Sequence, residues 1–270
     1  MSRPFLLAQL SDLHVRADST LSFGVVDTAG MLRACVRDLC EGTQRPDAVI
    51  ITGDLTESGR PEEYAVLRAL LAPLDVPLYL LPGNHDDRTA LREAFGEHAY
   101  LRAGGEFVQY AIDTHPLRIV AIDTVVAGAS HGELCNARLA WLERTLADAP
   151  ARATAVFMHH PPFKTFLGRM DSVALRDPAP FAEVIRRHAQ VEVVSCGHVH
   201  RPIDVRFAGT RASTAPSTAH HIHLDLDSDA PFRFRMEPPA YRLHAYAADT
   251  GLVSHTAYVG EFPGPYRFSE

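Results

Sequence analysis

Residues 78–86 read LYLLPGNHD and combine a buried-strand pattern with a polar turn. The four apolar residues 78–81 are typical of a short strand that is buried on both faces. A proline and a glycine end this strand, and Asn84, His85 and Asp86 follow at once. A turn rarely collects these three side chains directly after a buried strand, so the segment indicates both part of the fold and part of a functional site.

The same arrangement occurs twice upstream of this segment. Residues 48–54 read AVIITGD, an apolar run that ends in Asp54. Residues 5–14 read FLLAQLSDLH, a run that ends in Asp12 and His14. Each run is followed by a polar loop, as expected where a strand of an α/β fold reaches its carboxyl end.

The arrangement also occurs twice downstream. Residues 155–160 read AVFMHH and reach His159, whereas residues 191–200 read VEVVSCGHVH and reach His198 and His200. Because binding sites in open α/β sheets form beyond the carboxyl ends of strands, we expect the polar side chains of all five loops to meet at one edge.

Helical spacing of apolar residues separates these strands. It covers residues 25–41, a segment that begins near Pro61, residues 136–147 and residues 181–188. Residues 107–112 and 118–122 are predicted to form a strand pair around a turn. The alternation of strand, loop and helix predicts an α/β fold with largely buried sheets.

After residue 200 short strand candidates dominate, at residues 203–207, 222–226 and 243–247. We expect this part to complete a second sheet and to add a cap or a subunit contact. There is no internal repeat and no low-complexity tract.

Composition limits the classes of function. The chain has 270 residues, 46% of them hydrophobic, and a net charge of -7 with histidine neutral. It therefore lacks the overall basic field that attracts nucleic acid or anionic membranes. The N-terminal apolar run is too short for a signal peptide and no segment is long enough to span a membrane, which predicts a cytoplasmic protein. Four cysteines without CxxC spacing are expected to be reduced, buried residues.

The side chains of the five loops offer carboxylate, imidazole and amide oxygen donors, and no thiolate. This donor set suits Zn, Mn, Fe or Co ions. Two metal ions held close together need a shared ligand, and a carboxylate can bridge them. Asp54, which is central among the motifs, is the natural bridge.

The ordered motifs resemble the signature of the calcineurin-like metallophosphoesterase superfamily. Further details are similar to its bacterial branch of class III cyclic-nucleotide phosphodiesterases and glycerophosphodiesterases, namely Gly132 ahead of Trp141-Leu142, residues 159–162 (HHPP), Met170-Asp171 and residues 216–220 (PSTAH). The resemblance implies a four-layer α/β/β/α sandwich of two mixed sheets flanked by helices. Residues 1–225 would form the catalytic domain, and residues 226–270 would complete the second sheet and form a cap or oligomer contact.

The resemblance also implies a ligand assignment. One metal would be held by Asp12, His14, Asp54 and His200. The second would be held by Asp54, Asn84, His159 and His198. A hydroxide that bridges the two ions would attack phosphorus, because two cations strongly lower the pKa of bound water.

Three further residues receive roles from the same resemblance. His85 would face the substrate and protonate the leaving alkoxide or bind a phosphate oxygen. Asp86 is expected to orient His85. His220 would line the substrate pocket, with His221 and His223 beside it as alternatives.

Several other polar residues can have a structural role or lie at the surface without a function in the site. His160 is expected to be structural or to support the metal ligands from outside. We expect five histidines to be surface or satisfied core residues: His98, His115, His188, His244 and His255. Three cations near motif ends are either substrate contacts or ordinary surface charges: Lys164, Arg169 and Arg201.

The sequence therefore predicts a phosphodiesterase with two metal ions that acts on small diesters, either glycerophosphodiesters or cyclic nucleotides. A phosphomonoesterase or a nuclease would use the same ligands, and a non-catalytic metal-binding scaffold is the alternative of another class. The negative net charge of the chain argues against a nucleic-acid polymer as substrate. Relatives of this kind are often homo-oligomers, and a homo-oligomer is expected.

Overall fold

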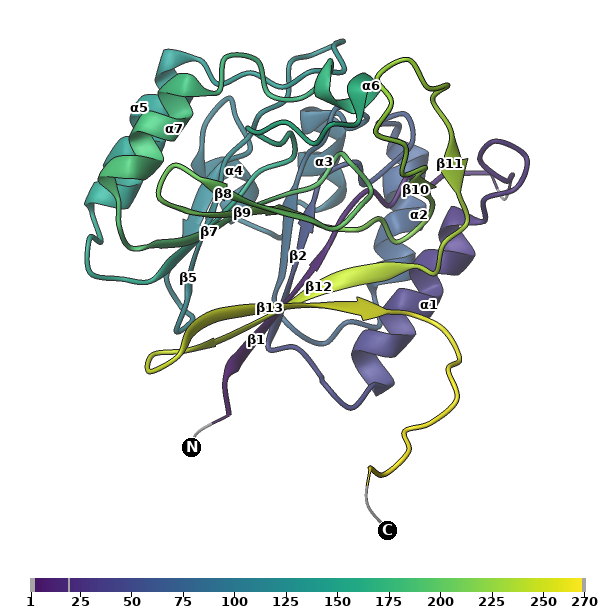
Figure 1. Ribbon diagram of the computed structural model, residues 1–270. Helices are drawn as coiled ribbons and strands as arrows, with labels where there is room; N and C mark the ends of the chain where they lie inside the picture. Colours follow the sequence, from purple (N-terminus) through teal and green to yellow (C-terminus); the bar gives the residue numbers. More distant parts are fainter. Residues whose placement is uncertain (1–2, 19, 269–270) are drawn as a thin grey trace.

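Two mixed β-sheets pack face to face between helices in the computed structural model, which describes residues 3–18 and 20–268 (Figure 1). The strands are β1 (Phe5–Leu10), β2 (Ala48–Thr52), β3 (Leu78–Leu81), β4 (Tyr110–Ile112), β5 (Arg118–Ala121), β6 (Thr154–Phe157), β7 (Val191–Cys196), β8 (Ile203–Phe207), β9 (Thr210–Thr214), β10 (His221–Ile222), β11 (Phe234–Arg235), β12 (Ala240–Ala247) and β13 (Gly251–Tyr258). The helices are α1 (Thr28–Glu41), α2 (Pro61–Leu71), α3 (Arg88–Ala94), α4 (Tyr100–Ala103), α5 (Asn136–Ala147), α6 (Gly168–Asp171) and α7 (Ala179–Arg187). The predicted α/β class and the two mixed sheets are confirmed.

The parallel parts of the two sheets carry the loops of interest. One sheet has the order β13-β12-β1-β2-β3, and the other has the order β4-β5-β6-β7-β9-β8. Strands β1, β2 and β3 run parallel, as do β5, β6 and β7. The carboxyl ends of these strands therefore point the same way within each sheet.

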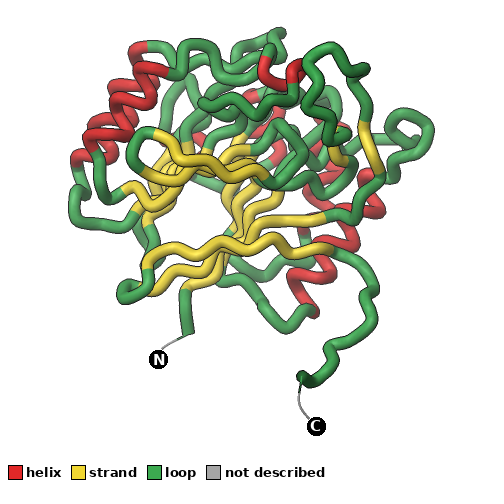
Figure 2. Tube along the Cα trace, viewed as in Figure 1, coloured by secondary structure: helices red, strands yellow, loops and turns green. Residues whose placement is uncertain are grey.

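Successive side chains of β5 and β6 point to opposite faces of their sheet, and this explains how the sheet packs between the other sheet and its own helices. Ile119 and Phe157 belong to the core shared with the first sheet, whereas Val120 and Val156 pack on the outer side with Leu142 of α5. In a strand successive side chains point to opposite faces, so one sheet can contact both the other sheet and its own helices. Figure 2 shows the strands in the middle of the molecule and helices on both flanks.

Helix α1 begins three residues later than its apolar spacing predicts. The carboxylate of Asp27 accepts a hydrogen bond from the backbone N–H of Gly30 at 2.8 Å, so Asp27 is the N-cap. This cap satisfies one of the free amide groups of the first turn and fixes the start of the helix at Thr28. Residues 25 and 26 lie before the helix as a result.

The strand pair predicted for residues 107–112 and 118–122 is present but shorter. Strands β4 and β5 pair antiparallel over three residues each. The backbone N–H of Val108 donates to the carboxylate of Asp123 at 2.9 Å instead of joining a sheet. A side chain thus takes the donor that would have extended β4.

The C-terminal strands differ from the prediction in the sheet that β12 and β13 join and in the length of the strand predicted at residues 222–226. Strand β12 pairs antiparallel with β1, and β13 pairs with β12, so both extend the sheet of the N-terminal strand. The strands predicted at residues 203–207 and 243–247 are confirmed. The strand predicted at residues 222–226 is wrong beyond Ile222, where the Asp225 side chain accepts from the amide of Asp227 and favours a turn.

The division at residue 225 and the cap or subunit contact beyond it stay predictions. No helix within the described ranges, 3–18 and 20–268, has the length and apolar character that a membrane span requires.

Candidate metal centre

The loops after five strands meet at one edge of the two sheets. They follow β1, β2 and β3 of one sheet and β6 and β7 of the other. The structure brings the side chains of all seven predicted ligands together there: Asp12, His14, Asp54, Asn84, His159, His198 and His200. All of these except Asn84 are buried.

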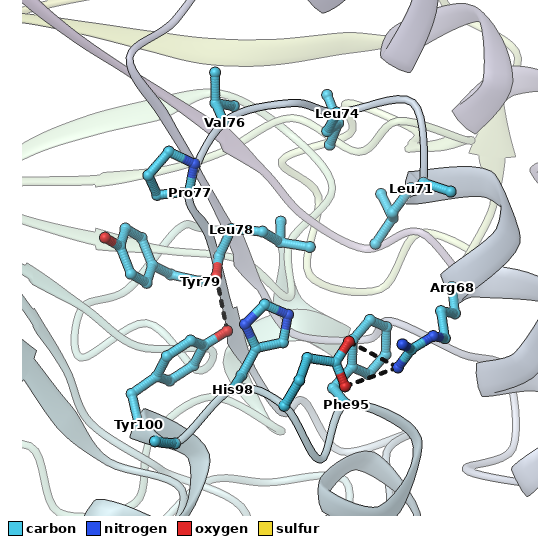
Figure 3. Close-up of a pocket in the computed structure, with 13 residues that line it drawn as sticks. Arg68, Leu71, Leu74, Val76, Pro77, Leu78, Tyr79, Phe95, His98 and Tyr100 are labelled. Carbon is cyan, nitrogen blue, oxygen red and sulfur yellow. Dashed lines mark hydrogen bonds and ion pairs between the residues drawn. The ribbon is translucent and has the colours of Figure 1, made fainter.

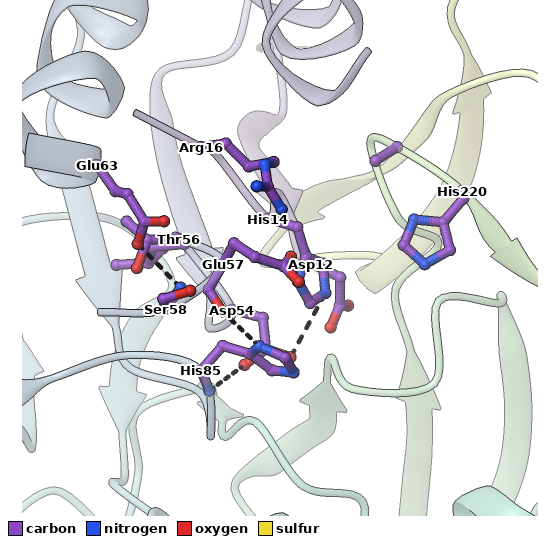
Figure 4. Close-up of polar contacts among 12 residues, drawn as sticks. Asp12, His14, Arg16, Asp54, Thr56, Glu57, Ser58, Glu63, His85 and His220 are labelled. Carbon is purple, nitrogen blue, oxygen red and sulfur yellow. Dashed lines mark hydrogen bonds and ion pairs between the residues drawn. The ribbon is translucent and has the colours of Figure 1, made fainter. Parts of the chain in front are cut away.

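The first group consists of four side chains whose potential ligand atoms all lie within 4.8 Å of one another: Asp12, His14, Asp54 and His200. The Nε2 atom of His14 lies 3.2 Å from Nε2 of His200 and 3.6 Å from Oδ2 of Asp54. The Nε2 atom of His200 lies 3.6 Å from Oδ1 of Asp12. Two carboxylates and two imidazoles therefore point at one small volume. Figure 4 shows Asp12, His14 and Asp54 of this group close together.

The second group lies on the other side of Asp54. The Nε2 atom of His159 lies 3.3 Å from Oδ1 of Asp54 and 3.2 Å from Oδ1 of Asn84. Ligand atoms of His159, His160 and His198 lie within 4.8 Å of one another. Asp54 thus presents one carboxylate oxygen to each group.

Hydrogen bonds fix the direction of three imidazoles. The Nδ1 atom of His159 lies 2.8 Å from the carbonyl oxygen of Thr52, and Nδ1 of His200 lies 2.9 Å from that of His220. The Nδ1 atom of His14 lies 3.1 Å from a carboxylate oxygen of Glu57. Because these oxygens accept, each Nδ1 carries a proton and each Nε2 is the nitrogen that faces the cluster, as in metal sites.

The remaining imidazole of the set has an unsatisfied nitrogen. Within the described part of the chain, the buried Nε2 atom of His198 has no hydrogen-bond partner. A buried polar atom without a partner is costly and calls for an explanation. A cation at the cluster would satisfy it, so the donor set and its orientation fit a metal site.

The backbone of the site is strained. Five of the nine non-glycine residues that the structure describes with positive φ belong to the seven candidates: Asp12, His14, Asp54, His198 and His200. Their φ angles lie between 48° and 71°, in the left-handed region that L-residues rarely adopt. Such strain persists only where the surroundings impose it, and it gathers at functional sites.

The charges of the cluster depend on one another. Burial raises the pKa of Asp12 to about 6, although His159 opposes this shift. Burial acts on Asp54 in the same direction, but the His159 imidazole and its neighbours hold the pKa of Asp54 well below its usual range. Burial disfavours the charged imidazoles, yet Glu57 and Asp54 raise the pKa values of His14 and His159 to about 9. The buried carboxylates thus attract positive charge, which metal ions also supply.

A cavity of about 210 Å³ opens beside the two groups. Its polar side is formed by His14, Asp54, Glu57, Asn84, Ser130, His85, His198, His200 and His220. Its apolar lining consists of Phe23, Met170, Val173, Ile222 and Phe232, and Arg169 also lines it. A small molecule in this cavity would therefore contact side chains of the carboxylate and imidazole cluster as well as apolar side chains.

The family model for calcineurin-like phosphoesterases matches residues 5–202, which include all seven candidate ligands. The chain belongs to the calcineurin-like phosphoesterase family. This phosphoesterase is 36% identical over 264 residues to the probable glycerophosphodiester phosphodiesterase GpdQ of Arcobacter nitrofigilis, with 97% of this chain and 96% of that protein covered. It is 30% identical over 230 residues to the 3',5'-cyclic adenosine monophosphate phosphodiesterase CpdA of Escherichia coli K12, with 83% and 82% covered.

A solved structure supports the fold assignment of the phosphoesterase. The crystal structure of a dimetal phosphatase from Danio rerio aligns with a TM-score of 0.64 over 96% of this chain and 100% of that chain. Its sequence is 16% identical, so the likeness concerns the fold alone.

His85 lies beside the cluster of the phosphoesterase without entering either group of predicted ligands. Its backbone N–H donates to Oδ1 of Asp54 at 3.0 Å, and its Nδ1 atom donates to the carbonyl oxygen of Glu57 at 2.8 Å. Its ring meets that of His14 edge-on, with centroids 4.7 Å apart. The free Nε2 atom is therefore available to a molecule in the cavity.

Asp86 does not orient His85, and this expectation is wrong. The Asp86 carboxylate accepts five hydrogen bonds, from the amides of Leu55, Thr56 and Gly83 and from the hydroxyls of Thr56 and Tyr64. It therefore joins the loop after β2 to the loop after β3 and positions Asp54 only through the backbone. The Glu57 carbonyl holds the His85 ring in its place.

Glu57 is a site residue that the sequence interpretation missed. Its carboxylate contacts His14 and its carbonyl contacts His85, so one residue fixes both rings (Figure 4). A single glutamate in a polar loop carries no signal of its own. Its position three residues after Asp54 would have been the only clue.

Among the neighbouring histidines of the C-terminal part, His220 lines the cavity. Its ring centroid lies 4.6 Å from that of His200 and 5.7 Å from that of His14. His221 points elsewhere, with Nε2 3.1 Å from the carbonyl oxygen of Pro238. Of the three histidines His220, His221 and His223, His220 is the one that lines this cavity, and its role toward a substrate stays a prediction.

Of the other singled-out residues, His160 belongs to the second group, and its buried Nε2 atom has no hydrogen-bond partner within the described residues. Its Nδ1 atom lies 2.7 Å from the hydroxyl of Thr124. Arg201 binds the carbonyl of Ile222 and the carboxylate of Glu237, and Lys164 is exposed. The histidines expected at the surface or in the core lie outside the clusters: His98, His115, His188, His244 and His255.

A larger cavity, of about 560 Å³, lies beside edge strand β3 and contains none of the seven candidates (Figure 3). Its wall contains an ion pair between Arg68 and Glu97 and a hydrogen bond from the Tyr100 hydroxyl to the Leu78 carbonyl. Size alone therefore does not identify the site of this phosphoesterase.

Two glycines test how closely the strand-end loops pack. A Cβ atom on Gly53, whose φ is +96°, would lie 2.3 Å from Nδ1 of His159, whereas one on Gly128, with φ +74°, would meet nothing within 4 Å. We expect Gly128→Ala to cost roughly 1–2 kcal/mol of unfolding free energy from backbone strain. Gly53→Ala should cost roughly 1–3 kcal/mol more, because of overpacking. Urea denaturation with a chelator present would measure both, and equal losses would contradict the close packing.

Proposed function

We propose that this phosphoesterase hydrolyses small phosphodiesters with the help of two metal ions. The observation that carries the proposal is the position of Asp54, whose Oδ2 lies 3.6 Å from Nε2 of His14 and whose Oδ1 lies 3.3 Å from Nε2 of His159. A single carboxylate with one oxygen toward each of two donor groups is the arrangement that a pair of close metal ions requires.

The ligand assignment follows the two groups. The first ion would be held by Asp12, His14, Asp54 and His200, and the second by Asp54, Asn84, His159 and His198. The carboxylate, imidazole and amide donors favour Zn, Mn, Fe or Co. When bound, such ions acidify a water molecule and neutralise the charge of the phosphate.

His85 is proposed to donate a proton to the leaving group. Its Nδ1 proton is committed to the Glu57 carbonyl, so Nε2 is the atom that can hold or release a proton toward the cavity. An alkoxide leaving group needs a proton as its bond to phosphorus breaks. His220, whose buried Nδ1 has no partner within the described residues, would bind an oxygen of the substrate.

The diester class is supported by relatives and by the shape of the site. The names of two relatives state glycerophosphodiesters and 3',5'-cyclic adenosine monophosphate as substrates. A cavity of about 210 Å³ suits a small molecule, and the net charge of -7 opposes a nucleic-acid polymer. A homo-oligomer and a cytoplasmic location stay predictions.

Paired assays test the function. We expect the protein reconstituted with Mn²⁺ to hydrolyse bis(p-nitrophenyl) phosphate with a higher kcat/KM than p-nitrophenyl phosphate, and to lose both activities with a chelator. The two compounds share a leaving group, so the comparison isolates the choice between diester and monoester. Preference for the monoester would overturn the diesterase assignment.

A further inference from the structure

A tight hairpin between β1 and α1 carries an aromatic ring at its tip. The backbones of Ser22 and Val26 exchange two hydrogen bonds of 2.9 Å, and the amide of Val25 donates to the Ser22 carbonyl at 3.2 Å. Phe23 and Gly24 are therefore the two central residues of the turn. Their φ angles are 53° and 74°, the signs of a type I′ turn.

A phenylalanine is out of place in the first central position of such a turn. That position favours asparagine, aspartate or glycine, because the β-carbon of a bulky residue is strained at positive φ. The strain is not offset by burial in the core, since Phe23 keeps 65% of its surface exposed. Strain without burial points to a use for the ring where it stands.

The exposed ring belongs to the lining of the cavity beside the metal centre. Phe23 lines the cavity, and its centroid lies 5.5 Å from the His220 ring in an edge-on arrangement and 5.1 Å from the Phe234 ring. These contacts orient the ring relative to the site. They also connect the hairpin to the segment that contains β10 and β11.

A second exposed ring lines the same cavity from another segment. Phe232 precedes β11 and keeps 57% of its surface exposed. Met170, Val173 and Ile222 fill the wall with apolar surface. These apolar side chains offer wide faces for a flat ring and no partner for a hydroxyl group, and the polar partners of the cavity, among them Arg169 and His220, come from the other lining residues.

We propose that Phe23 and Phe232 form a subsite that binds a planar aromatic group of the phosphodiester, such as a nucleobase or a phenyl ring, in preference to glycerol. This inference rests on the proposed diesterase function and specifies its substrate class. Aromatic side chains stack on any flat π-surface, so the subsite selects for planarity and not for one base. Glycerol has no such surface, and its hydroxyls would lose water against an apolar wall.

The test compares substrates that differ in planarity. KM and kcat would be measured for cyclic AMP, bis(p-nitrophenyl) phosphate and glycerophosphoethanolamine with the full-length protein loaded with Mn²⁺. We expect Phe23→Ala to raise KM for the first two about tenfold or more, and KM for the third much less. Phe23→Tyr, which keeps a flat ring, should restore values near those of the wild type.

Phe166 offers a matched control. It is also a phenylalanine with positive φ, 63°, and an exposed surface of 71%, but it does not line the cavity. Phe166→Ala should keep wild-type KM values for all three substrates. Equal changes for the planar and non-planar substrates in Phe23→Ala, or no change at all, would overturn the subsite.

Calorimetry separates this inference from the function on which it rests. Binding of AMP and of glycerol 3-phosphate to the loaded protein requires no turnover. If the wild type hydrolyses no diester, the proposed function fails, whereas weaker AMP binding in Phe23→Ala with unchanged glycerol 3-phosphate binding still supports the aromatic subsite. Equal binding of AMP by the wild type and Phe23→Ala overturns it.

Discussion

Asp54→Asn is expected to lower kcat for diester hydrolysis by more than about a hundredfold, because even partners outside the ligand shell contribute roughly 10–100-fold. The substitution keeps the size of the side chain and removes its charge. Asp54 faces His14 with one oxygen and His159 with the other, so both proposed metal positions lose a ligand at once. No other carboxylate among the described residues of the two clusters spans both groups.

Metal content and activity should be measured on the same sample of Asp54→Asn. We expect fewer than two ions per chain by inductively coupled plasma mass spectrometry. Asp86→Asn is a matched control, since its carboxylate accepts only from amide and hydroxyl donors of the adjacent loops and of α2. That variant should lose stability and keep two ions. An Asp54→Asn protein with two ions and full activity would refute the bridge.

His85→Ala is expected to leave the metal content unchanged and to lower kcat by about 10²–10⁴-fold, the range typical of a lost general acid. The loss should depend on the leaving group. A p-nitrophenolate leaves without a proton, so bis(p-nitrophenyl) phosphate should be affected least, and glycerophosphoethanolamine should be affected most. The free Nε2 of His85 is the atom on which this expectation depends, because Nδ1 is bonded to Glu57.

The control for this variant is His255→Ala, which removes an exposed imidazole from β13. It should behave as the wild type toward both substrates. The same fractional loss of kcat in His85→Ala for both leaving groups would show that His85 binds the phosphate and does not protonate the leaving oxygen.

The gathering of the seven candidate ligands could be predicted from sequence for a physical reason. Each lies in a loop directly after a short apolar run, and parallel strands place the ends of such runs at one edge of a sheet. Asp12 and His198 are 186 residues apart, yet the His198 amide donates to the Asp12 carboxylate at 2.9 Å. Topology, and not closeness in the chain, joins them.

The direction of neighbouring side chains could not be predicted in the same way. His85 and Asp86 are adjacent, but the turn after β3 points the first toward the cavity and the second toward the amides of another loop. Glu57 becomes a site residue because the fold brings His14 to its carboxylate and His85 to its carbonyl oxygen. Such directions depend on backbone angles that a motif does not specify.

The pairing of β12 with β1, which are far apart in the chain, also could not be predicted from the sequence. Strand β12 reads AYRLHAYA, a composition that does not indicate which of the two sheets the strand joins. It pairs with β1, with Phe5 opposite Tyr246 and Gln9 opposite Arg242. Buried contacts such as that of Gln9 with His244, at 2.9 Å, belong to this pairing and are specific to the folded chain.

One chain is expected to hold two metal ions, and hydrolysis is expected to require both. Metal-free protein should be titrated with Mn²⁺, with bound metal counted and hydrolysis of bis(p-nitrophenyl) phosphate followed in the same samples. We predict saturation at two ions per chain, with full activity reached only as the second ion binds. Saturation at one ion, or full activity in the metal-free protein, would contradict the account.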